Sequence, residues 1–194
     1  MVLLRPSRAD SKLALMVPHR FFDRLSSPVG RGAYFRSGAW LLLENTAHRH
    51  WGKAEGEEYG PGDVAHREAT ALHALTKGLL AGRKNLLLAQ IHGFTGGAEA
   101  GEKVPEAFAI VSDGTPEPGP AARALAGKLK ASGLSVLLYG PDTRRMGATE
   151  NVQGRHLRAT GNHRFLHIEL SLPLREQLKA DASALADALR AAAD

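Results

Sequence analysis

The stretch NLLLAQIHGF, residues 85–94, holds the pattern that decides the fold. It is a short, continuous apolar run closed by a histidine and a glycine, which is typical of a strand buried on both faces of a sheet. Gly93 has no Cβ, so a backbone or a ligand can come close to His92. Similar runs recur along the chain, and the sequence therefore predicts five strands: 39–45, 85–94, 106–114, 135–140 and 164–171.

Helical patterns separate these strands. Asp63 stands where a helix N-cap is expected, ahead of a helix over residues 64–82. Residues 118–133 predict a second helix, and the Ala- and Leu-rich C-terminus predicts more. The alternation indicates one α/β domain over residues 1–194, with a three-layer, mostly parallel (mixed) twisted sheet flanked by helices, of the phosphorylase/hydrolase-like type. Residues 1–36 could add N-terminal edge strands.

Composition limits the chemistry and the compartment. The 194 residues include no cysteine, so disulfides and thiolate metal sites are excluded, and any metal must be held by His, Asp or Glu. Nine histidines are more than such a chain normally carries. No apolar run approaches the roughly 18–20 residues that span a bilayer, and the N-terminal run LALMV is too short for a signal peptide. We expect a cytoplasmic protein without a membrane partner.

The charge permits an anionic partner without indicating one. The net charge is +5 and the pI is about 9.7, but the basic residues are spread along the chain, with the densest pair at 144–145. A scattered excess is typical of solvated surface. A basic α/β module that binds nucleic acid or another polyanion remains the alternative to an enzyme, and it predicts salt-sensitive binding.

Ionisable side chains follow three of the predicted strands. His48 comes a few residues after the first strand, His92 ends the second, and Glu169 lies near the end of the last. In an open α/β sheet, ligands bind outside the carboxyl ends of the strands. These three side chains should therefore meet at one edge of the sheet.

Glu68 is a fourth candidate, because it falls on the inner stripe of the predicted helix between Ala65 and Leu72. A buried carboxylate costs several kcal/mol unless it is paired or bound to a metal. The alternative is a structural role, in which Glu68 forms a salt bridge with Arg67 or Arg83 at the helix edge.

Together, His48, Glu68 and His92 could form a zinc site with an open fourth position for water, and Glu169 could act as the general base. His50 could replace His48 as a ligand. Asp63 or Glu44 could replace Glu68.

A polar stretch before the last strand, GATENVQGRHLR (147–158), could bind the substrate. Asn151 and Gln153 supply amides, and the guanidinium of Arg155 can hold a carboxylate with two hydrogen bonds. Arg155 is therefore grouped with Glu169 in the predicted catalytic machinery. The alternative is an ordinary loop with glycine turns.

The order of the motifs ENTAHRH, HREATALHAL, LAQIHGF and FLHIELS resembles that of zinc amidohydrolases with a parallel sheet. This group comprises N-acetylmuramoyl-alanine amidases, N-formylglutamate amidohydrolases and phage poly-γ-glutamate hydrolases. The resemblance covers residues 39–178, and HIELSLPLR is most similar to the late strand-to-helix junction of the last two families. One departure is that the His-Gly-Gly of many relatives after the first strand is absent here.

The resemblance implies a carboxypeptidase-like hydrolase that uses Zn²⁺. Its expected reaction is cleavage of an amide bond in an acyl-amino acid, a γ-linked peptide or a cell-wall peptide, with a small-molecule or peptide substrate that carries a carboxylate. A metal-free relative that keeps only the fold is the remaining possibility, because the first motif is altered.

Overall fold

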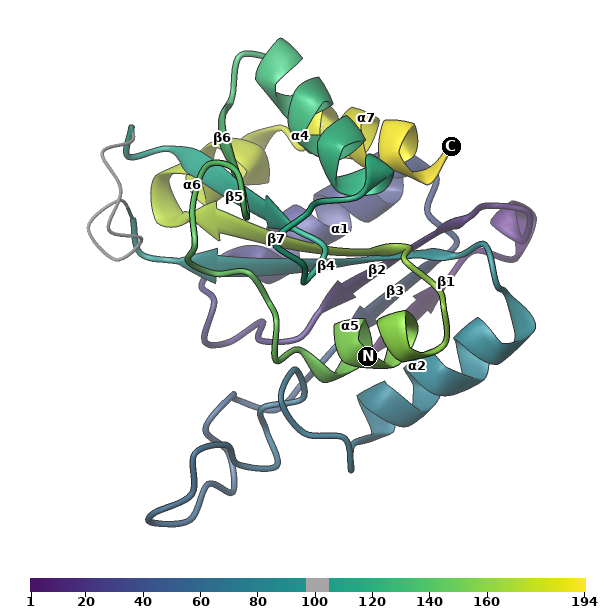
Figure 1. Ribbon diagram of the computed structural model, residues 1–194, viewed down its shortest axis with the longest axis vertical. Coiled ribbons are helices and arrows are strands. Elements are labelled where there is room, and N and C mark those ends of the chain that lie inside the picture. The colour runs from purple at the N-terminus through teal and green to yellow at the C-terminus, as the bar shows by residue number, and fades with distance from the viewer. Residues whose placement is uncertain (97–104) are drawn as a thin grey trace.

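The computed structural model describes residues 1–96 and 105–194. Its strands form one sheet in the order β1-β3-β2-β4-β7-β5-β6 (Figure 1). Their bounds are β1 Val2–Leu4, β2 Leu13–Val17, β3 Leu41–Glu44, β4 Leu87–Phe94, β5 Phe108–Ser112, β6 Ser135–Leu138 and β7 Phe165–Ser171. The five strands predicted from the sequence are all present.

The sheet is mixed and mostly parallel, as predicted. Strands β3, β2, β4 and β7 run parallel to one another, and β6 runs parallel to β5. The antiparallel pairs are β1 with β3 and β5 with β7. The carboxyl ends of β2, β3, β4 and β7 therefore lie along the same edge of the sheet.

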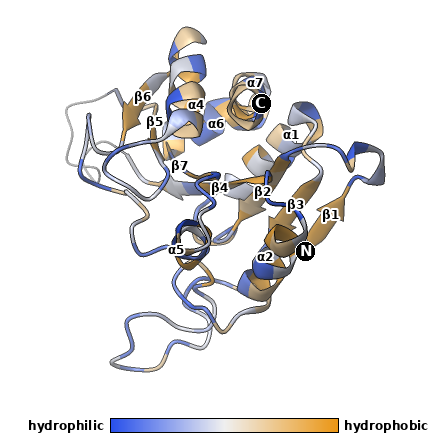
Figure 2. Ribbon diagram, turned by 45° about the vertical axis from the view of Figure 1, so that its right-hand side comes forward, coloured by the Kyte–Doolittle hydropathy of each residue, from blue (hydrophilic) through white to orange (hydrophobic). Residues whose placement is uncertain are grey.

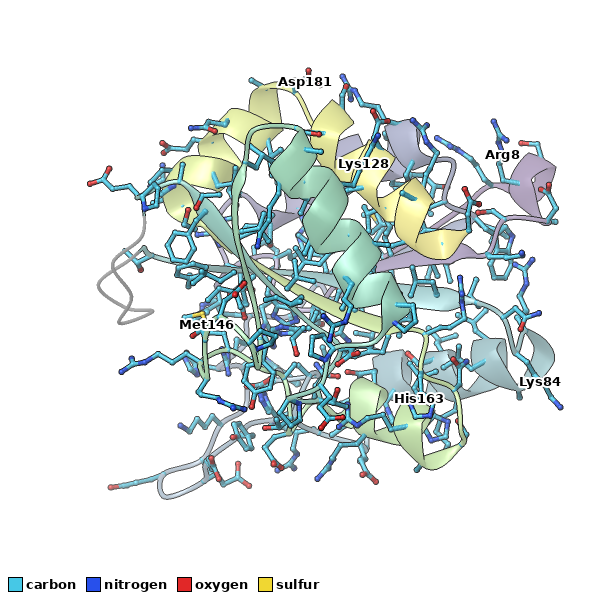
Figure 3. All side chains as sticks on the ribbon, turned by 45° about the horizontal axis from the view of Figure 1, so that its top comes forward. Arg8, Lys84, Lys128, Met146, His163 and Asp181 are labelled. Atoms are coloured by element: carbon cyan, nitrogen blue, oxygen red, sulfur yellow. The ribbon has the colours of Figure 1, made fainter. Side chains whose placement is uncertain are left out.

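Helices cover both faces of the sheet and complete the three layers. Helices α1, α4, α6 and α7 pack on one face, and α2 and α5 pack on the other (Figure 1). Their bounds are α1 Ser26–Ser37, α2 Ala71–Gly82, α4 Pro120–Ala131, α5 Val152–Ala159, α6 Leu172–Ala180 and α7 Ser183–Ala193, and a 3-10 turn spans Pro6–Arg8. Figure 2 shows apolar strands enclosed between these layers, with polar loops outside. Arg8, Lys84 and Asp181 point outward from the periphery (Figure 3).

Residues 1–36 contribute more than the edge strands expected from the sequence. β1 is an edge strand, but β2 lies inside the sheet between β3 and β4, and residues 26–37 form helix α1. All five residues of β2 are buried, since helices cover both faces of the strand. LALMV is therefore a fully buried interior strand of only five residues.

Two other elements differ from the predictions. Helix α2 begins at Ala71, where Thr70 caps it by accepting a hydrogen bond from the backbone NH of His73, so Glu68 precedes the helix and is exposed. Within α2, His73 is buried, whereas Leu75 is 45% exposed. The predicted loop 147–158 contains all of α5 except its last residue, and Asn151 caps this helix. Within the described residues, no helix has the length and apolarity needed to cross a membrane.

Candidate metal centre

Three buried side chains converge at the carboxyl ends of the adjacent strands β2 and β4. They are His19 and Asp23, in the turn after β2, and His92 in β4. One ligand atom from each lies within 4.8 Å of the others. Asp23 Oδ2 is 3.8 Å from His19 Nδ1 and 3.4 Å from His92 Nδ1. The arrangement offers two imidazole nitrogens and one carboxylate to a single point.

The turn from β2 to α1 aims Asp23 at β4. Its backbone NH donates to the carbonyl of His19 at 2.8 Å, which closes the turn. Its Oδ2 accepts from the backbone NH of Gly93 at 3.1 Å. Arg175 makes the close approach expected at Gly93: a Cβ there would lie 1.1 Å from Arg175 Nη1. Only glycine leaves room for this guanidinium, whose Nη2 donates to the carbonyl of Phe94.

A second carboxylate orients His19. Asp63 Oδ1 lies 3.0 Å from His19 Nε2 and 2.9 Å from His66 Nδ1, and its Oδ2 accepts from Arg49 Nε at 2.8 Å. Burial acts to raise the pKa of Asp63, but the hydrogen bonds from His19 and His66 hold that pKa well below its usual range. An ionised Asp63 keeps the proton of His19 on Nε2. The Nδ1 of His19 is buried without a hydrogen-bond partner and lies 3.8 Å from Asp23 Oδ2.

The charge states of the other two groups also suit a cation. Burial and the nearby His19 lower the pKa of His92 well below its usual value, so its imidazole is neutral. Burial raises the pKa of Asp23 to about 6, against the opposing effects of His19 and the Gly93 hydrogen bond. Near neutral pH Asp23 is therefore an anion and the imidazole of His92 is neutral, in a buried space. Two imidazoles and a carboxylate fit a divalent metal such as zinc, and a carboxylate behind one imidazole is a frequent supporting contact.

Glu169 lies directly beside this group. It is the register partner of His92 on the neighbouring strand β7, and its Oε1 is 3.6 Å from His167 Nε2. The rings of His92 and His167 are 4.3 Å apart, and burial, together with His92, lowers the pKa of His167 well below its usual value. His92, His167 and Glu169 form a second set of three ligand atoms within 4.8 Å of one another. A carboxylate in this position can exchange a proton with a group held at the metal site.

The structure brings together some, but not all, of the residues that the sequence singled out. His92 and Glu169 meet as expected. His48 and Glu68 are exposed, and neither belongs to the two sets of potential ligands found among residues 1–96 and 105–194. Glu68 instead lies 3.5 Å from Arg155. Glu68 therefore forms a salt bridge, as the structural alternative expected, but with Arg155 and not with Arg67 or Arg83.

The alternative ligands have other partners. His50 is exposed, and its ring contacts that of Phe22 at 5.0 Å. Glu44 is buried, and its carboxylate accepts hydrogen bonds from Ser27 and Arg31. Asp63 does reach the centre, as the partner of His19 described above.

The predicted substrate-binding residues divide in the same way. Asn151 and Gln153 are buried, and their side-chain amides bond within the protein. Arg155 is exposed on α5, between Glu68 and Glu150.

His19 and Asp23 are the functional candidates that the sequence interpretation missed. The available signal was PHRFFDR directly after LALMV, a histidine and an aspartate four residues apart following an apolar run. Recognising it required LALMV to be read as a strand.

No family model matches the sequence. No curated protein matches it either. Solved structures do match, at low identity. A gene product of Agrobacterium tumefaciens is 16% identical with a TM-score of 0.66, covering 98% of this chain and 94% of that one. A bacteriophage poly-γ-glutamate hydrolase is 11% identical with a TM-score of 0.60, covering 99% and 86%.

Two further structures extend this likeness. N-formylglutamate amidohydrolase from Ralstonia eutropha is 14% identical with a TM-score of 0.56, covering 99% of this chain and 96% of that one. YndL, described in a zinc-free form, is 15% identical with a TM-score of 0.54, covering 91% and 74%. At such identities the match concerns the fold. The chain has the α/β fold shared by N-formylglutamate amidohydrolase and poly-γ-glutamate hydrolase.

Proposed function

We propose that this protein is a zinc-dependent hydrolase of amide bonds, with His19, Asp23 and His92 as the metal ligands. The observation that carries the proposal is the convergence of His19, Asp23 and His92, which place one potential ligand atom each within 4.8 Å of the others in a buried space. Asp23 Oδ2 lies 3.8 Å from His19 Nδ1 and 3.4 Å from His92 Nδ1, so a carboxylate oxygen stands beside two imidazole nitrogens, a donor set that zinc binds. The proposal keeps His92 from the sequence-based ligand set and replaces His48 and Glu68.

Each supporting residue has a definite task. Zinc held by these ligands would supply Lewis-acid chemistry, polarising a carbonyl and acidifying water. Asp63 keeps the proton of His19 on Nε2 and so keeps Nδ1 available. Glu169 would take a proton from the attacking water and return it to the leaving amine nitrogen, the usual role of a general acid–base carboxylate. The neutral imidazole of His167 lies beside this carboxylate, with Nε2 3.6 Å from Glu169 Oε1, which is beyond hydrogen-bonding distance.

The proposed substrates are acyl-amino acids, γ-linked peptides or cell-wall peptides that carry a carboxylate. Two of the structural neighbours are named for N-formylglutamate and poly-γ-glutamate, and both compounds are amides of this kind. Arg155 remains the proposed anchor for the substrate carboxylate. It would have to leave its exposed contacts with Glu68 and Glu150, which are weak in water.

Metal content and hydrolysis of N-formylglutamate, γ-glutamyl peptides and muramoyl peptides test the proposal. We expect about one zinc per chain in the wild type, and its loss in His19→Ala and Asp23→Ala. Glu169→Gln should keep the zinc and lose the activity. His48→Ala and Glu68→Ala are the matched controls, and both should retain the metal. Zinc retained in His19→Ala, or lost equally in the two controls, would refute the ligand assignment.

A further inference from the structure

A chain of buried amides leads from the backbone to His92. Gln90, Gln153 and Asn151 are each at most 2% exposed, and they come from two elements, β4 and the start of α5. Gln90 shares the strand face of His92, two residues before it. The sequence suggested a substrate-binding role for Asn151 and Gln153, but both side chains bond to Gln90, which in turn faces His92.

Backbone groups fix the orientation of the two outer amides. Asn151 Oδ1 accepts from the backbone NH groups of Gln153 and Gly154 at 3.1 and 3.0 Å, so the other end of this amide, Nδ2, must donate. Gln153 Nε2 donates to the carbonyl of Val64 at 2.9 Å, so Gln153 Oε1 must accept. An amide flip at either residue would place like groups against each other, which costs about 1–3 kcal/mol per buried unsatisfied group.

These two anchors orient Gln90. Its Nε2 donates to Gln153 Oε1 at 3.0 Å, and its Oε1 accepts from Asn151 Nδ2 at 2.7 Å. Gln90 Oε1 also lies 3.2 Å from His92 Nε2. An oxygen that can only accept therefore faces this ring nitrogen. Asp23 Oδ2 faces the other nitrogen, Nδ1, but at the longer distance of 3.4 Å, and it already accepts from the backbone NH of Gly93, so the geometry favours the proton of the neutral imidazole on Nε2. The lone pair of His92 is then on Nδ1, which is directed at Asp23 Oδ2, 3.4 Å away.

We propose that Gln90, held by Gln153 and Asn151, is a positioning residue that fixes the Nε2–H tautomer of His92 and keeps Nδ1 free to bind a metal. The metal-binding consequence rests on the proposed function, whereas the tautomer does not. Asp63 acts on His19 in the same sense, through an anion, and Gln90 acts on His92 through a neutral amide. The tautomers of the two imidazoles are thereby fixed before a cation binds, one by Asp63 and the other by Gln90.

The tautomer can be measured directly from the ¹⁵N chemical shifts of the His92 ring in the metal-free protein at neutral pH. We expect Nε2 to be protonated and Nδ1 unprotonated in the wild type. Gln90→Met removes the acceptor at nearly constant volume and should shift the population toward Nδ1–H. Gln90→Glu restores an acceptor and should restore the Nε2–H form. Leu87→Ala, on the opposite face of the same strand, is the control for loss of packing and should leave the tautomer unchanged.

Zinc affinity, measured by competition with a chelator, is the second readout. Removing a hydrogen-bond partner of a metal-bound histidine typically weakens binding about 10- to 100-fold, which is the loss expected for Gln90→Met. Asn151→Asp keeps the cap of α5 but removes the donor to Gln90, so it should also lower the zinc affinity. This variant serves as the test if Gln90→Met does not fold.

A wild-type His92 protonated on Nδ1, or a Gln90→Met protein with unchanged ring shifts and unchanged zinc affinity, would overturn the proposal. If the wild type binds no zinc but shows the Nε2–H tautomer that Gln90→Met alters, the proposed function fails and the positioning role of Gln90 stands.

Discussion

Asp63 Oδ1 lies 3.0 Å from His19 Nε2, although 44 residues separate the two in sequence. This contact joins the turn after β2 to the long polar segment that follows β3. It ties the proposed metal site to residues outside the sheet.

Asp63→Asn is therefore expected to weaken zinc binding about 10- to 100-fold without removing a ligand. The amide can still contact His19, but it no longer holds the proton on Nε2 by charge. Chelator competition measures the effect, with the exposed Glu68→Gln as the control. Equal zinc affinity in Asp63→Asn and wild type would contradict this role.

Gly93→Ala should destabilise the protein and reduce zinc binding together. The new Cβ would overlap the guanidinium of Arg175, which must then leave its place beside Asp23 and the carbonyl of Phe94. Overpacking of this kind costs about 1–3 kcal/mol. Denaturant unfolding and metal content check the prediction. Gly96→Ala is the matched control, because a Cβ at Gly96 would meet nothing within 4 Å.

Glu44→Gln should lower the free energy of unfolding and leave zinc content unchanged. The carboxylate is fully buried and binds Ser27 and Arg31, so its replacement weakens a charged network by about 1–3 kcal/mol. The exposed Glu55→Gln should be neutral in the same unfolding experiment. A loss of zinc in Glu44→Gln would instead favour Glu44 as a ligand.

His73 predicts a pH dependence away from the metal site. Burial, followed by the nearby His156, lowers the pKa of His73 below its usual value of 6.5. The unfolded chain then binds a proton more readily than the folded protein as the pH falls through about 6.5. His73 therefore lowers stability on the acidic side and has no such effect above that pH.

The test compares wild type with His73→Gln in unfolding experiments at pH 5 and pH 7.5, both with a chelator present. The variant should lose less stability than the wild type between the two pH values. Titrations elsewhere in the chain cancel in this difference. Parallel pH profiles for the two proteins would contradict the assignment.

The sequence was sufficient to predict five of the seven strands and two residues of the candidate site. His92 and Glu169 could be recognised because each lies in a long apolar run whose strand character is unambiguous, and parallel strand ends share an edge. His19 and Asp23 could not, because β2 has only five residues and its position depends on pairing with two distant strands. No local pattern indicates that β2 lies next to β4.

Glu68 illustrates a different limit. Its ligand role followed from helical periodicity that begins at residue 64, but the chain makes turns around Asp63 before α2 starts. The hydrogen bonds of Asp63 to three separate side chains compete with helix formation there. Tertiary contacts thus decide where the helix begins, and the face that carries Glu68 is solvated.

The position of β2 inside the sheet has a consequence for synthesis on the ribosome. Its partner β4 begins 70 residues after β2 ends, so synthesis at about 5–20 residues per second delays the pairing by several seconds. During that interval one edge of an entirely apolar strand has no partner in the nascent chain. The same delay separates His19 and Asp23 from His92, so the three proposed ligands can come together only after the chain has been translated through β4.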